Sequence, residues 1–72
     1  MKTTDNRRLE LKLELVRRDM RHRELAASLR DRGFEVETSD IDRLMIGRWD
    51  PSAEIKQAIA EIFTRPSFEL FQ

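Results

Sequence analysis

The sequence predicts an all-α fold, a compact bundle of about five short helices. Three observations lead to this prediction. Apolar residues recur at helical spacing in several short segments, glycine and proline residues separate these segments, and β-branched residues are almost absent from the first of them. The connections that remain between the segments are short, which is typical of compact helical domains.

The length of 72 residues fits one small domain, which we expect to span residues 5–72 after a flexible tail over residues 1–4. The chain has no Cys and a single His, so the sequence predicts neither a disulfide nor a metal site. It has no apolar run long enough to span a membrane, and its polar first residues predict no secretory signal. We therefore expect a cytoplasmic domain without cofactor, small-molecule ligand or enzymatic activity.

The first helix is expected over residues 7–18, capped by Thr4 or Asp5. Its leucines alternate in the sequence, so a helix places them on two nearly opposite faces. We expect the inner face to carry a stripe of four residues: Leu9, Leu13, Val16 and Met20. The second stripe, Leu11 and Leu15, then needs a partner, either another helix of the domain or a second subunit, so these two residues are the dimer candidates.

A second helix is expected over residues 22–32, followed by a glycine that suits a left-handed helix terminus. Its predicted inner face consists of Leu25, Ala26 and Leu29. If Gly33 terminates this helix, Phe34 can fold back onto Leu29.

A short third helix is expected to start at Thr38 or Ser39 and to end before Gly47, with an apolar inner face of Ile41, Leu44 and Met45. A fourth helix is expected to run to Phe63, with Asp50 as its cap and Pro51 at its first position. Its predicted stripe is Ile55, Ala58, Ile59 and Ile62. A last helix or turn after Pro66 carries Phe68 and Phe71, which we expect to close the core or to join a dimer contact. Trp49 is expected in the core or as a lid over the corner between the third and fourth helices.

The net charge is zero but the charges are unevenly distributed. Residues 1–32 carry ten Lys or Arg and six Asp or Glu, whereas residues 33–72 carry four and eight. The basic half fits a face for nucleic acid, since arginine favours bidentate contacts with phosphate. It equally fits a solvated helical surface that packs against the acidic half of the domain or of a neighbouring molecule.

Several segments, in order, resemble the lambda-repressor-like helix-turn-helix family. They are RHRELAASL at 21–29, IDRLMIGR at 41–48, DPS at 50–52, IAEIF at 59–63 and PSFELF at 66–71. A small residue such as Ala26 lets two short helices cross closely, as a helix-turn-helix requires. Six residues, from Arg30 to Glu35, separate Leu29 from Val36. The turn is thus lengthened, which is similar to the arginine-repressor DNA-binding domain.

The resemblance implies a sequence-specific DNA-binding domain, acting as a small transcriptional regulator or repressor of a phage or bacterial kind. The helix at about residues 38–46 would lie in the major groove of double-stranded DNA, and a homodimer would occupy two half-sites. The base-contact candidates are Thr38, Ser39, Asp42 and Arg43. The phosphate-contact candidates are Arg17, Arg18, Arg21, His22, Arg23 and Arg48.

Each of these assignments has a structural alternative. Arg43 either pairs with guanine or forms a salt bridge to Asp40 or Asp42, and Thr38 or Ser39 either contacts bases or caps the helix. The alternative function is a protein–protein interaction module that has a helix-turn-helix fold and little DNA affinity. It is suggested by the zero net charge, the acidic third helix and the unpaired leucine stripe.

Overall fold

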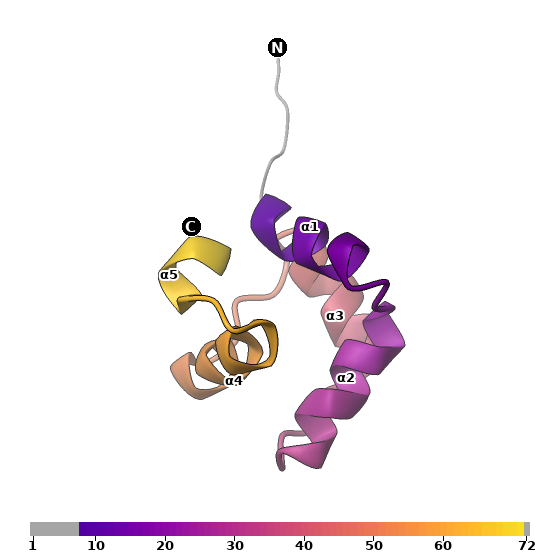
Figure 1. The fold of residues 1–72 in the computed structure, drawn as a ribbon. Coiled ribbons are helices and arrows are strands. Elements are labelled where there is room, and N and C mark those ends of the chain that lie inside the picture. The colour runs from indigo at the N-terminus through magenta and orange to yellow at the C-terminus, as the bar shows by residue number, and fades with distance from the viewer. Residues whose placement is uncertain (1–7, 72) are drawn as a thin grey trace.

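Five α-helices account for most of residues 8–71, the part of the chain that the computed structural model describes (Figure 1). They are α1 (Leu9–Arg17), α2 (His22–Asp31), α3 (Thr38–Met45), α4 (Ala53–Phe63) and α5 (Ser67–Leu70). No strand occurs within the described residues, so the predicted all-α fold is confirmed. The predicted tail over residues 1–4, and the capping residues Thr4 and Asp5, lie outside them.

The two glycines terminate α2 and α3, as predicted. Gly33 has a φ of 95° and Gly47 a φ of 78°, values that favour glycine. After α2, the N–H of Phe34 donates to the carbonyl of Leu29 at 3.1 Å, and the N–H of Gly33 donates to that of Arg30 at 2.9 Å. This pair of bonds satisfies carbonyls that the end of a helix would otherwise leave without partners.

Helices α1 and α4 are also followed by a residue in the left-handed conformation, but in neither case is that residue glycine. Asp19 follows α1 with a φ of 51°, and Thr64 follows α4 with a φ of 52°. The N–H of Met20 donates to the carbonyl of Leu15 at 2.9 Å, the same closing bond that ends α2. Aspartate tolerates the left-handed conformation, but a β-branched threonine is strained in it. The sequence pattern signals these two ends less clearly because no glycine marks them.

The start of α4 differs from the prediction. The capping residue is Ser52, whose Oγ accepts a hydrogen bond from the N–H of Ile55 at 3.3 Å. Pro51 is buried and lies before the cap, not at the first helical position. Asp50 instead forms an ion pair with Lys56, with Oδ1 and Nζ 2.8 Å apart. A serine that reaches its N3 amide is as good a cap as aspartate, which frees the carboxylate for Lys56.

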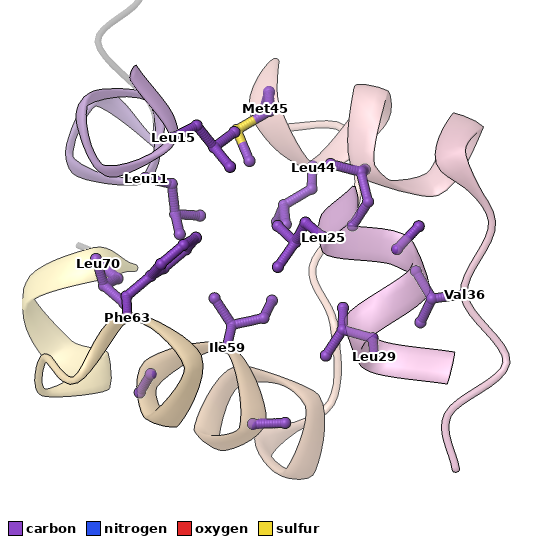
Figure 2. Close-up of a cluster of buried hydrophobic side chains, with 14 residues drawn as sticks. Leu11, Leu15, Leu25, Leu29, Val36, Leu44, Met45, Ile59, Phe63 and Leu70 are labelled. Carbon is purple, nitrogen blue, oxygen red and sulfur yellow. The ribbon is translucent and has the colours of Figure 1, made fainter. Parts of the chain in front are cut away.

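All five helices contribute side chains to one hydrophobic core (Figure 2). The predicted inner faces of α2 and α3 are confirmed, since Leu25, Ala26 and Leu29 and also Ile41, Leu44 and Met45 are buried. Of the stripe predicted for α4, Ala58 and Ile59 are buried, whereas Ile55 and Ile62 are partly buried against the core. Phe34, Trp49 and Phe71 also pack against it, but Phe68 is exposed and does not close it.

The prediction that Leu9, Leu13, Val16 and Met20 face inward is wrong, and of the two partners expected for Leu11 and Leu15 the structure shows the other helices of the domain. Leu11 and Leu15 are buried and point toward the side chains of Phe63 and Met45 (Figure 2). The predicted inner residues are on the surface, with exposed fractions of 46% for Leu9, 36% for Leu13 and 77% for Val16, and Met20 is only partly buried. Leu11 and Leu15 therefore belong to the core, so they are not available as a dimer contact. The error arose because the alternating leucines gave two equivalent stripes and nothing in the pattern said which one faces inward.

A buried carboxylate lies on the same inner face of α1. The Glu14 side chain accepts hydrogen bonds from Arg17 at 3.0 Å, Arg18 at 3.1 Å and Arg65 at 2.9 Å, and it is only 7% exposed. Burial by itself raises the pKa of Glu14, but the hydrogen bonds from Arg18, Arg65 and Arg17 outweigh this effect and hold the pKa below its usual value. The carboxylate is therefore ionised at neutral pH.

Arg65 extends this network to both ends of the described chain. Besides Glu14, its guanidinium donates to Glu10 of α1 at 2.9 Å and to Glu69 of α5 at 2.9 Å. Arg18 donates a further hydrogen bond to the carbonyl of Phe63 at 2.7 Å and lies over the ring of that residue. These contacts attach α1 to the corner between α4 and α5.

Candidate nucleic-acid interface

The four base-contact candidates lie on the exposed surface of α3. Thr38 is its first residue, and Thr38, Ser39, Asp42 and Arg43 are all exposed. The cap residue before α3 is Glu37, whose N–H donates to Asp40 at 2.9 Å. Neither Thr38 nor Ser39 is the cap, so their hydroxyl groups are not used in capping.

A hydrogen bond joins the first turn of α2 to the exposed face of α3. His22 Nδ1 and Asp42 Oδ1 are 2.6 Å apart, and both side chains are partly open to solvent. His22 was predicted to contact phosphate and Asp42 to contact bases, so the structure brings together one candidate from each group. No sequence pattern indicates this pair, because the two residues are twenty positions apart on different helices.

Arg43 is paired within its own helix. Its guanidinium forms a salt bridge with Asp40, one of the alternatives expected from the sequence. The pKa of Asp40 is lowered, first by the hydrogen bond from the backbone of Glu37 and then by Arg43. The Arg43 side chain remains about half exposed. An exposed pair of this kind contributes little to stability and can be exchanged for another partner.

Arg17 and Arg18 are paired with the buried carboxylate of Glu14. Arg18 is further held by Phe63, so its guanidinium has a structural role in attaching α1 to α4. No sequence pattern indicates this role, because the accepting carbonyl lies 45 residues away.

The remaining phosphate-contact candidates are exposed arginines. Arg21 and Arg23 flank the start of α2, and Arg48 follows α3. Within residues 8–71 none of the three takes part in an ion pair. Arg21 precedes α2 as its capping residue, and its N–H donates to Glu24 at 2.6 Å. The start of a helix carries partial positive charge, so these side chains add to a local potential that favours anions.

Other kinds of site find no support in the part of the chain that the structure describes. No group of three His, Asp or Glu residues could hold a metal ion, and no helix is long and apolar enough to cross a membrane. An open groove lies between α4 and the α2–α3 connection, and it is lined by three apolar residues and four polar or charged ones: Phe34, Ala53, Ala58, Arg32, Glu54, Gln57 and Glu61.

Comparison of the chain with family models, with curated proteins and with solved structures finds no match. The structure itself defines a small all-α domain in which two adjoining helices, α2 and α3, present a mixed polar and charged surface.

Proposed function

We propose that this domain binds double-stranded DNA in a sequence-specific manner and acts as a small transcriptional regulator, with α3 in the major groove. The observation that supports this most is the His22–Asp42 hydrogen bond, which joins the start of α2 to the exposed face of α3. In a helix-turn-helix these two surfaces contact phosphate and base edges respectively. Arg21 and Arg23 lie beside the first of them and Arg43 on the second.

The proposal assigns different contacts to the charged residues. Arg43 would exchange its Asp40 partner for the O6 and N7 atoms of guanine, and Asp42 would accept a hydrogen bond from the amino group of cytosine. Arg21, Arg23 and Arg48 would contact phosphates. Arg18 is left out of this set because its guanidinium bonds to Glu14 and Phe63.

The test is an NMR titration of the labelled domain with mixed-sequence duplex DNA at low and then moderate salt, followed by selection of a preferred duplex. We expect shifts at residues 21–23 and 38–43 that weaken as salt rises, since phosphate contacts release counterions. On the selected duplex, Arg43→Ala should weaken binding by roughly 5- to 150-fold, the equivalent of about 1–3 kcal/mol.

Arg32→Ala is the matched control. Arg32 is also an exposed arginine, but it pairs with Glu61 of α4 at 2.9 Å, away from the start of α3. This variant should bind the selected duplex nearly as well as the unmodified domain. Equal affinity of the Arg43 variant and the control would refute the assignment of Arg43 to a base.

The alternative function is a protein-interaction module with little DNA affinity. The observation that favours it is the set of carboxylates on α3, in which Asp40 pairs with Arg43 and Asp42 with His22. Carboxylates repel phosphate, so they oppose non-specific binding to DNA. The absence of any shift at low salt would favour this alternative over DNA binding.

A further inference from the structure

The outer face of α1 is an unpartnered apolar stripe. Leu9, Leu13 and Val16 are four and then three positions apart, so they follow one side of the helix, and all three are exposed. Lys12 and Arg17 lie on the two flanks of the stripe. Exposed aliphatic side chains aligned in this way are typical of a contact surface rather than of a solvated helix.

A groove of complementary character lies on α4. Phe34 and Ala58 contribute apolar surface to it, and Ala53 lines it from the first turn of α4. Arg32, Glu54 and Glu61 line the same groove, so its charged side chains carry a net negative charge. Glu61 is paired with Arg32, whereas Glu54 has no ion pair among residues 8–71.

The stripe and the groove are on different parts of the molecule. In Figure 1, α1 lies at one end and the C-terminal end of α2, next to the connection that carries Phe34, lies at the other. A single copy therefore cannot place its own α1 stripe in its own groove.

We propose that a second copy of this chain fills the groove with its α1 stripe, in a head-to-tail contact. The charges favour this occupant, because Lys12 beside the stripe and Glu54 beside the groove have opposite signs, whereas Arg17 and Glu61 are paired with Glu14 and Arg32. The same asymmetry runs through the whole chain, with an excess of basic residues over 1–32 and of acidic residues over 33–72. The contact does not depend on DNA binding.

Pairing of like surfaces is less favourable. Two stripes brought face to face place their basic flanks together, and two grooves brought together oppose two surfaces of net negative charge. Only the heterologous contact joins surfaces of opposite net charge around apolar side chains. It leaves one stripe and one groove unfilled in every open assembly, so association continues along a chain of copies or closes into a ring.

The contact is small and should be weak. The nine residues of α1 make a helix about 14 Å long, so the area buried falls below that of a standard stable interface. We therefore expect the weight-average mass to rise with protein concentration between micromolar and millimolar. Added salt should reduce the rise without abolishing it.

The test uses two variants that each spoil one surface, measured by sedimentation in the absence of DNA. Val16→Glu places a charge in the stripe, and Ala53→Arg places one in the groove. Both residues are exposed, so the fold should be unaffected, which circular dichroism checks. Each variant alone should remain monomeric, because one of its two surfaces is spoiled. An equimolar mixture should form dimers and no larger species, because only the intact stripe of one variant and the intact groove of the other can pair. Thr38→Glu and Ser39→Arg, at exposed positions outside both surfaces, are the matched controls and should associate like the unmodified domain.

Three outcomes would overturn the proposal. The first is an unmodified domain that stays monomeric at millimolar concentration. The second is a mixture of the two variants that stays monomeric although the unmodified domain associates. The third is self-association of Ala53→Arg while Val16→Glu is monomeric, because this result indicates that two stripes pair with each other.

Discussion

Replacing Glu14 by glutamine should destabilise the domain by about 2 kcal/mol at neutral pH. The carboxylate accepts hydrogen bonds from Arg17, Arg18 and Arg65, and each charge-assisted bond is worth roughly 1.5–3 kcal/mol when it is removed singly. Three effects make the expected loss smaller than the sum of three such bonds. Glutamine keeps one acceptor oxygen, its burial costs less than that of a charge, and solvent screens the largely exposed Arg17.

The assay is thermal and urea unfolding followed by circular dichroism. In a domain of this size, about 1 kcal/mol shifts the melting temperature by roughly 4–8 °C, so Glu14→Gln should lower it by about 8–16 °C. The matched control is Glu61→Gln, which removes an exposed pair with Arg32 and should cost no more than about 1 kcal/mol.

The pH dependence provides a second check on the same prediction. The pKa of Glu14 is lower in the folded protein than its ordinary value of 4.5, so its contribution is complete above pH 4.5 and is lost as the pH falls through the folded-state pKa. The stability difference between the unmodified domain and Glu14→Gln should therefore be constant near neutral pH and shrink in acid. Equal stability of the two proteins at neutral pH would refute the argument that the arginines offset the burial of this carboxylate.

Two further predictions concern stability. Leu11→Ala should lower the free energy of unfolding by about 2–5 kcal/mol because Leu11 is buried, whereas Val16→Ser should change it by no more than about 0.5 kcal/mol. Comparable losses for the two variants in urea unfolding would contradict the observed orientation of α1. Thr64→Gly should raise the free energy of unfolding by about 0.5–1 kcal/mol, because it removes the strain of a left-handed threonine. The gain is partly offset because glycine increases the conformational entropy of the unfolded chain. Its melting temperature should rise by a few degrees, and a decrease would show that the Thr64 hydroxyl bond to the Phe63 carbonyl matters more than the strain.

The sequence was sufficient to predict most of the helices because their boundaries depend on local chemistry. Gly33 and Gly47 terminate helices where they were expected to, and α5 follows Pro66 as expected. The cap of α4 was placed two residues early because Asp50 and Ser52 both have capping side chains. The local pattern does not distinguish between them, and in the structure Ser52 caps the helix whereas Asp50 pairs with Lys56.

The orientation of α1 could not be obtained from the sequence. Its inner face carries Glu14, which a hydrophobicity pattern assigns to solvent, and the carboxylate is accommodated there by Arg17, Arg18 and Arg65, the last from a segment 51 residues away. The contacts of the candidate interface could likewise be predicted only in part. The Arg43–Asp40 pair follows from helical spacing, but the His22–Asp42 bond depends on how α2 and α3 pack.

The attachment of α1 to the α4–α5 corner has a consequence during synthesis. When α1 is synthesised, Arg65, one of the three arginines that bind its inner carboxylate, and Phe63, toward which Leu11 points, have not yet been translated. The α2–α3 pair can form from neighbouring segments, but α1 acquires its full set of partners only after Phe63 and Arg65 emerge. Of the five helices, α1 is therefore among the last to be secured, and until then Leu11 remains exposed to chaperones and to other nascent chains.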